Sequence, residues 1–433
     1  MKYVLLVANL LIATHSVDAQ ELLSLQDAIA IGLQNSHNIR IAANERDIAE
    51  NNFTRGNAGF LPVVSWNGGR NYSRQNVNQE FINGSMNEKN GATSNTWSTG
   101  VDLRWTLFDG MRMFRTYDRL DALRGLSALD EELQIEDAIF AIALAYYDVV
   151  LQAQRANVFD TTLQLSGQRV ALSQVRYELG KAPKLDYLSA MVDYNTDSSA
   201  LVVQQEALTR ARQNLNHVMG RDIDTELITA TEITLDSTLS HEAILSRALS
   251  ANTALRRLER NSAILQLESE EIKAERLPSV DLNLGYAYNN LSSQAGFLLS
   301  NRTNGLNYGL SATWTLFNGN DIMRRQENTL ILLDSNRERI AQLRLQIERD
   351  VESAWLDYEN SQKLENLERA SLEVALETAA IARDRYNLGK ATFLELREAQ
   401  VNTVRVASRL FDAQYNMKVA ELELLRLSGS IIQ

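Results

Sequence analysis

Arg176-Tyr-Glu-Leu-Gly-Lys-Ala-Pro-Lys-Leu-Asp186 is the stretch that decides the fold of this 433-residue chain, because it occurs twice. Its second copy, Arg385-Tyr-Asn-Leu-Gly-Lys-Ala-Thr-Phe-Leu-Glu395, lies 209 residues downstream with Arg, Tyr, Leu, Gly, Lys and Ala in register. Each copy separates two long segments of helical apolar periodicity, and Gly180 and Gly389 stand where a helix C-cap is expected. We therefore expect each copy to be the tip of a long helical hairpin.

A second landmark repeats at the same offset. Trp105-Thr-Leu-Phe-Asp-Gly110 returns as Trp314-Thr-Leu-Phe-Asn-Gly319, so the chain carries an internal duplication. We place the first repeat at 20–220, a polar linker at 221–240 and the second repeat at 241–433. The expected helical tips fall at about 180–184 and 389–392.

Composition excludes several classes of function. A net charge of -12 argues against nucleic-acid binding, which needs a basic surface. The absence of cysteine excludes disulfides, thiolate nucleophiles and thiolate metal sites. His37, His217 and His241 are isolated, and no phosphate-binding loop or catalytic spacing occurs. We expect no enzymatic activity, no cofactor and no metal.

The N-terminus has the pattern of a cleaved export signal at residues 1–19. Met1-Lys2 is a basic start, an apolar run follows, and Val17-Asp18-Ala19 offers the small residues that a signal peptidase reads. The alternative is a buried N-terminal core segment. Because no cysteine is present, the mature N-terminus is expected to carry no lipid through one. No further apolar stretch is long enough to form a transmembrane helix.

The elements before each repeated strand pair follow one plan. A short helix, a break and a second helix precede a Leu-Pro pair, because the residue before proline leaves the helical region. The expected helices are 25–34 and 38–60 in the first repeat, and 242–249 and 254–276 in the second.

After each proline the apolar period changes from helix to strand. From Val280 to Asn289 apolar and polar residues alternate strictly, which predicts a strand. We expect β-hairpins at about 61–108 and 278–317, with polar loops at 73–96 and 290–306. Gly68 and Arg70 interrupt the alternation after Val63, which indicates a bulge or an early end of the apolar band.

Strands of about ten residues with aromatic ends are typical of a transmembrane β-barrel, although each alone could be a soluble hairpin. Four strands are too few to close a barrel, so several copies of the chain would have to complete it. Trp105 and Trp314 then suit the membrane interface, because each ends an alternating strand just before a polar turn.

Proline-free helices are expected at 111–179 and 321–388, each about 100 Å long at 1.5 Å per residue. Shorter helices return at 185–219 and 394–427, and the helices before the prolines could stack on them end to end. A tube that spans a distance needs helices of this length.

Together these features resemble the TolC-type outer membrane efflux proteins over essentially the whole mature chain. The resemblance rests on the twofold repeat, the Leu-Pro strand starts, the Trp-x-Leu-Phe-Asp/Asn-Gly strand exits and the Arg-Tyr-x-Leu-Gly tips. It implies an α+β membrane protein of Gram-negative bacteria. Long α-helical coiled-coil hairpins would form a periplasmic tunnel, and four β-strands per chain would join a trimeric outer-membrane β-barrel embedded in lipid.

The resemblance also implies partners and site residues. The homotrimer would dock with a periplasmic adaptor protein and an inner-membrane transporter of the RND or ABC type, and the transporter chooses the cargo. Docking is expected at the two tips, and gating at polar residues beside them. The docking residues are Leu179, Gly180, Lys181, Leu388, Gly389 and Lys390, and the gate residues are Asp186, Tyr386, Glu395 and Glu398.

In the family, two acidic positions of the second returning helix line the closed entrance, and they match Glu395 and Glu398, which lie three residues apart on one helix face. The resemblance thus implies that three copies form a carboxylate ring that favours cations. Asp186 and Tyr386 fall on the family's closing hydrogen bonds, whereas Ala391 stands where some relatives have a latch arginine. The plainer alternatives are a solvated glutamate face, lysines that complement helix dipoles, and Tyr386 as packing. The alternative for the whole chain is a secreted, non-membrane coiled-coil spacer.

Overall fold

The computed structural model describes residues 22–235, 239–295 and 298–432, so the expected signal peptide lies outside the described residues. The chain divides into two compact units, which we treat separately. Unit 1 comprises Met1–Arg40, Gln134–Asn252 and Ile347–Gln433, and unit 2 comprises Ile41–Leu133 and Thr253–Gln346.

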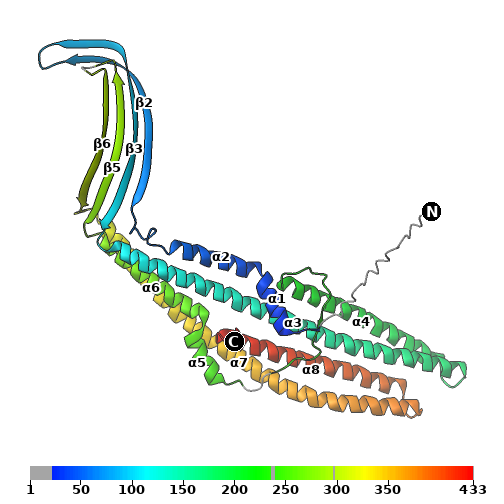
Figure 1. Cartoon of the computed structure of the whole chain (residues 1–433). Helices are drawn as coiled ribbons and strands as arrows, with labels where there is room; N and C mark the ends of the chain where they lie inside the picture. Colours follow the sequence, from blue (N-terminus) through cyan, green and yellow to red (C-terminus); the bar gives the residue numbers. More distant parts are fainter. Residues whose placement is uncertain (1–21, 236–238, 296–297, 433) are drawn as a thin grey trace, which may run out of the picture. The chain divides into compact units, whose positions relative to one another are not determined.

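Two long helical hairpins have their tips in unit 1 (Figure 1), and the first parts of their outgoing helices belong to unit 2. The first joins α3 (Arg112–Glu178) to α4 (Lys184–Val218), and the second joins α7 (Asp321–Asn387) to α8 (Phe393–Leu427). The outgoing helices have 67 residues each and the returning helices 35, which confirms the expected long hairpins. Among the described residues, no helix combines the length and apolar character needed to cross a membrane.

The core of unit 1 gathers short elements around the long hairpins. Helices α1 (Leu25–Asn35) and α5 (His241–Ala251) belong to unit 1, as does a parallel pair of short strands, β1 (Leu22–Leu23) and β4 (Ile228–Thr229). The buried Tyr146 hydroxyl on α3 donates to the Leu23 carbonyl at 3.0 Å and accepts from the Ala230 amide at 3.2 Å. One side chain of α3 therefore fastens the β1–β4 pair to the helical core.

Unit 2 contains a four-stranded antiparallel sheet. Its strands are β2 (Val63–Glu80), β3 (Met86–Phe108), β5 (Ser279–Ser293) and β6 (Ser300–Thr313), in the order β2-β3-β5-β6. The pairing of β3 with β5 joins the two repeats into one sheet. Within the chain β2 and β6 are the edges, and each leaves one row of backbone donors and acceptors without a strand partner.

The sheet has one apolar and one polar face. Trp66, Val101, Tyr286 and Leu306 are opposed across the four strands, so their side chains share a face, and all four are exposed. Asp102, the next residue along β3, points to the other face, where it accepts from Asn67 Nδ2 at 2.7 Å. An exposed apolar face opposite a hydrogen-bonded polar face is the reverse of a soluble sheet packed on a core.

The strands are longer than expected, and the predicted loop at 73–96 was wrong. The β2–β3 ladder continues to Glu80 and Met86, because backbone pairing does not require apolar side chains. The register shift lies between Gln75 and Val77 and not at Gly68, so the irregular alternation there is an early end of the apolar band. The second hairpin is likewise longer, since β5 runs to Ser293.

Two boundaries also differ from the sequence prediction. Helix α2 (His37–Asn52) ends well before residue 60, because Asn57 Nδ2 donates to the Asn52 carbonyl at 2.9 Å and turns the chain. Its counterpart α6 (Thr253–Ala274) continues almost to the proline, as expected. Strand β6 stops at Thr313, paired with Ser279, because the preceding Pro278 has no N–H to extend the ladder.

Candidate functional site at the hairpin tips

The two tips of unit 1 have the same backbone geometry. Gly180 and Gly389 have φ of 68° and 70°, and a Cβ added at either would meet nothing within 4 Å. The Lys181 amide donates to the Arg176 carbonyl at 2.8 Å, and the Lys390 amide bonds in the same way at 2.8 Å. This is the glycine-terminated helix end that the repeated motif predicts.

The returning helices start differently in the two hairpins. Thr392 caps α8, because its hydroxyl accepts from the Glu395 amide at 3.2 Å while the Glu395 carboxylate faces the Thr392 amide at 3.4 Å. Glu395 also lies 3.8 Å from the guanidinium of Arg385. In α4, Pro183 stands at the cap position without a side-chain bond, and Asp186 lies in the first turn. Glu395 thus holds a helix start, whereas Glu398 is simply exposed.

A cavity of ≈ 680 Å³ lies between the tips, and both Asp186 and Tyr386 line it. Among the described residues no hydrogen bond joins their side chains. The cavity is bridged by Arg176, which stands 5.0 Å from the Tyr386 ring centre and donates to the Tyr386 and Asn387 carbonyls at 3.5 and 3.3 Å. Tyr386 is 7% exposed, while its repeat equivalent Tyr177 is 39% exposed.

The outer surface of the tips is apolar with a basic rim. Leu179 and Leu388, which the sequence singles out, are exposed beside the exposed Lys181 and Lys390. Sequence reasoning missed a second repeated pair, Leu185 and Leu394, which are 70% and 71% exposed. Their identical place in the two motif copies was the available signal. Exposed leucines at both tips offer an apolar contact surface to another protein.

Sequence reasoning also missed a charged cluster that joins the two hairpins. Arg397 on α8 donates from Nη1 and Nη2 to Asp197 on α4 at 2.8 Å each, and its Nε lies 3.6 Å from Asp193. Arg169 on α3 donates to Asp193 at 3.1 Å, and the Ser166 hydroxyl donates to Asp197. The side chain of Arg169 is only 3% exposed.

Burial and pairing act on these arginines in opposite directions. Burial lowers the pKa of Arg169, and the Asp193 carboxylate works against that shift. The hydrogen bond to Asp197 raises the pKa of Arg397, although burial opposes it. Arg169 also donates to Gln400 at 3.0 Å and lies 4.8 Å from the Phe393 ring centre, so it contacts α8 as well as α4.

Trp105 and Trp314, which occupy equivalent positions in the two repeats, make equivalent hydrogen bonds. The indole N–H of Trp105 donates to the Phe60 carbonyl at 2.9 Å, and that of Trp314 donates to the Arg276 carbonyl at 3.0 Å. Each bond ties the exit of one strand to the turn that leads into its neighbour. Both rings remain exposed, so this bond leaves their apolar surface free.

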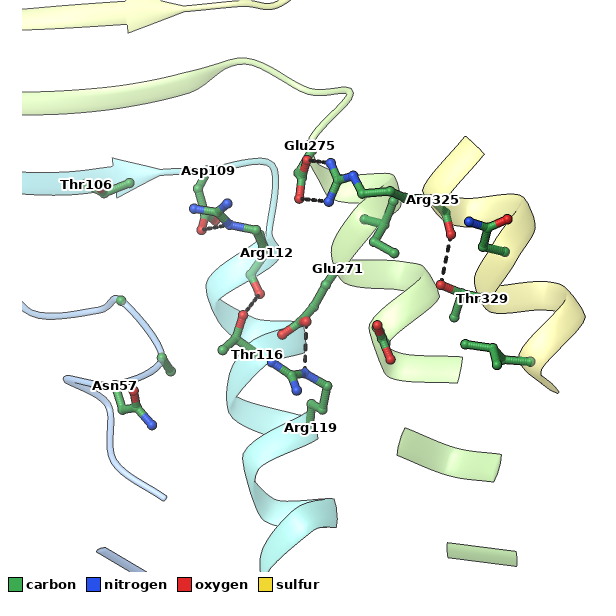
Figure 2. Close-up of a pocket in the computed structure, with 16 residues that line it drawn as sticks. Asn57, Thr106, Asp109, Arg112, Thr116, Arg119, Glu271, Glu275, Arg325 and Thr329 are labelled. Carbon is green, nitrogen blue, oxygen red and sulfur yellow. Dashed lines mark hydrogen bonds and ion pairs between the residues drawn. The ribbon is translucent and has the colours of Figure 1, made fainter. Parts of the chain in front are cut away.

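A second cavity, of ≈ 690 Å³, lies in unit 2 where the sheet meets the helices (Figure 2). Its arginines face carboxylates: Arg325 pairs with Glu275, and Arg119 donates to Glu271 at 2.9 Å. These pairs link neighbouring helices and leave the arginines without free charge for a ligand. Within 22–235, 239–295 and 298–432, no three acidic or histidine side chains come together as a metal site.

The sequence matches a known protein family over most of its length. Residues 29–221 and 244–430 match the family model described as outer membrane efflux protein, and the chain belongs to this family. Its members are channels of Gram-negative outer membranes that work with adaptors and inner-membrane transporters in tripartite or type I secretion systems. The chain is therefore an outer membrane channel for efflux or type I secretion, and not a secreted spacer.

Individual proteins and solved structures are also similar to this chain. The proteases secretion protein PrtF of Dickeya chrysanthemi is 23% identical over 360 residues, covering 80% of this chain and 76% of the relative. Protein CyaE of Bordetella pertussis is 23% identical over 385 residues, covering 86% and 77%. The crystal structure of CusC matches with a TM-score of 0.75 at 17% identity, covering 94% of this chain and 92% of CusC.

Proposed function

We propose that three copies of this chain form one export channel in the outer membrane. The observation that carries the proposal is the sheet of unit 2, with an exposed apolar face and two unpaired edges. In lipid an open edge is not tolerated, so β2 of one copy must pair with β6 of the next. Three copies with four strands each give a twelve-stranded barrel, above the smallest size that closes.

The apolar face then contacts lipid and the polar face lines the channel. Trp105 and Trp314 stand at the periplasmic ends of their strands, where exposed indole rings suit the membrane interface. The helical hairpins continue the channel into the periplasm as a tunnel. Residues 20–220 and 241–433 act as its two repeats, with 221–240 as the connecting linker. A signal peptide at 1–19 would direct the export of the chain.

The tips are the periplasmic end of this channel. Leu179, Gly180 and Lys181, with Leu388, Gly389 and Lys390, dock the adaptor, and the exposed leucines at both tips support that role. Asp186, Tyr386, Glu395 and Glu398 form the gate, and the shared cavity of Asp186 and Tyr386 supports it. An inner-membrane transporter of the RND or ABC type drives export, and the similarity to the proteases secretion protein of Dickeya chrysanthemi supports a protein cargo. The chain itself does no chemistry.

Disulfide cross-linking can test whether β2 of one copy pairs with β6 of the next, because the chain contains no cysteine of its own. One cysteine replaces Asn71 on β2, and a second is placed in turn at positions 302–310 of β6. At one register, oxidation should give covalent dimers and trimers on a non-reducing gel, with nothing larger. The control pair replaces Ser98 and Asn289, which are register partners within one chain, and should leave a monomer.

The opposite results are equally clear. If no β6 position cross-links to β2 of another copy, the strands do not close between chains. A ladder that continues beyond three chains would contradict the trimer.

A further inference from the structure

The buried cluster between the hairpins has an uneven division of charge. The first hairpin supplies Arg169, Asp193 and Asp197, which together carry one negative charge in excess. The second hairpin supplies Arg397, whose charge makes the cluster neutral. If α8 moved away, Asp197 would lose both hydrogen bonds from the Arg397 guanidinium and keep the hydrogen bond from the Ser166 hydroxyl. A buried carboxylate without a cation is strongly disfavoured, so the cluster favours contact between the hairpins.

The residues of this cluster are not repeated in the other half of the internal duplication. At the equivalent positions of the other repeat, Arg397 is matched by Leu188, Asp193 by Asn402 and Asp197 by Val406. The repeated residues form the tip turn in both hairpins, whereas the cluster forms only where the two unlike hairpins meet. Ser166 and Arg169 hold α3 to α4 within the first hairpin, and Arg397 joins this group to the second hairpin.

Other polar links between the hairpins are weaker or more exposed. At the tip, Arg176 reaches two carbonyls at 3.3 and 3.5 Å without meeting a carboxylate. Further from the tip, Arg155 pairs with Asp412, whose side chain is 45% exposed. Arg397 has two bonds of 2.8 Å to a carboxylate that is 10% exposed. Near the tips it makes the strongest bond between hairpins.

We propose that Arg397 is the lock that holds the periplasmic entrance closed in this chain. The proposal rests on the proposed function, since it needs the tips to be the entrance. While Arg397 is paired, α8 stays against α3 and α4, and the entrance can widen only after the bond to Asp197 breaks. Arg397 is thus a positioning residue of the gate, one turn of α8 or less from Glu395 and Glu398.

Two measurements on the detergent-purified full chain test this lock. In Arg397→Met the apolar stem is kept and the charge is lost. Amide hydrogen exchange in residues 393–405 should become at least about tenfold faster, because a buried pair is broken. Reconstituted in planar bilayers, the variant should spend at least about tenfold more time in its highest conductance state than the unmodified channel.

The matched control is Arg409→Met. Arg409 lies on the same helix and also holds a carboxylate with two bonds, Glu368 at 2.8 and 3.0 Å, but that partner is on α7 of its own hairpin. Its loss should leave the conductance unchanged. A rescue variant, Arg397→Asp with Asp197→Arg, restores opposite charges and should return the conductance towards that of the unmodified channel.

The outcomes separate the lock from the proposed function. An unmodified chain that never conducts, with faster exchange in Arg397→Met, would contradict the channel and with it the entrance, although Arg397 would still join the hairpins. A conducting chain with the same exchange and conductance in Arg397→Met would overturn the lock. If Arg397→Met does not assemble, Asp197→Asn decides by the same two measurements, because it removes the same ion pair at constant side-chain size.

Discussion

Arg397 on α8 and Asp197 on α4 form an ion pair with two hydrogen bonds, each with a nitrogen–oxygen distance of 2.8 Å. The two side chains are 16% and 10% exposed, so water screens the pair little. This pair joins two helices that belong to different hairpins and to different repeats of the chain. It therefore joins the two hairpins of unit 1 close to the start of α8.

Removing one member of the pair should destabilise unit 1 more than removing both. In Arg397→Met a buried carboxylate is left with a hydroxyl, at a cost of about 3–5 kcal/mol. Arg397→Met combined with Asp197→Leu replaces the pair by apolar contacts and should cost clearly less. Thermal unfolding followed by circular dichroism compares the two. A double variant that melts below the single variant would contradict this reading.

The two landmark glycines of unit 2 should respond unequally to alanine. Both have left-handed backbones, Gly110 at φ 74° and Gly319 at φ 68°. A Cβ at Gly110 would lie 2.4 Å from the Ala274 carbonyl oxygen, whereas one at Gly319 meets nothing within 4 Å. Gly319→Ala should lower the free energy of unfolding by about 1 kcal/mol, because alanine disfavours the left-handed backbone conformation. Gly110→Ala must also move α6 and should lower the melting temperature further; equal losses would contradict the close contact.

A bulky residue at a tip should stop docking without disturbing assembly. At Gly389 there is room for a side chain, since nothing lies within 4 Å of its Cβ position. Gly389→Trp should leave the oligomer intact and lower export at least about tenfold, because the ring covers the surface that the adaptor contacts. Gly389→Asn is the control, as asparagine tolerates the left-handed backbone. Normal export by Gly389→Trp would place the adaptor elsewhere.

Ion selectivity should depend on Glu398, the exposed glutamate of the proposed gate. Glu398→Gln removes three carboxylates from a trimer and should reduce the preference for cations, measured as the reversal potential in a salt gradient. Glu395→Gln should act in the same direction without loss of the helix cap, because glutamine can replace glutamate in a capping box. Glu377→Gln, an exposed site on α7, is the control. An unchanged reversal potential in Glu398→Gln would remove that residue from the pore.

The sequence predicted the long hairpins and their tips well, because these depend on local signals. Gly180 and Gly389 mark left-handed turns, and runs without proline permit helices of 67 residues. Strand length was predicted less well, because the ladder beyond Ser73 is held by backbone bonds between polar residues, which leave no apolar alternation.

The charged cluster could not have been predicted from spacing. Arg397 and Asp197 are 200 residues apart, and neither lies in a repeated motif. Whether the two side chains meet depends on how one hairpin packs on the other. The periodicity of the sequence predicts the helices but does not predict this packing. The same holds for Arg176, which reaches carbonyls of the other tip 210 and 211 residues away. Local signals in the sequence determine each hairpin, whereas tertiary packing determines the site between the hairpins.

Copies of this chain should together form one conducting channel across the outer membrane. Its most direct measurement is the current across a planar lipid bilayer after addition of the purified, unheated oligomer. We predict stepwise increases in conductance with a preference for cations, which disappear when the oligomer is heated to monomers before addition. An intact oligomer that inserts without any current step would contradict a conducting channel.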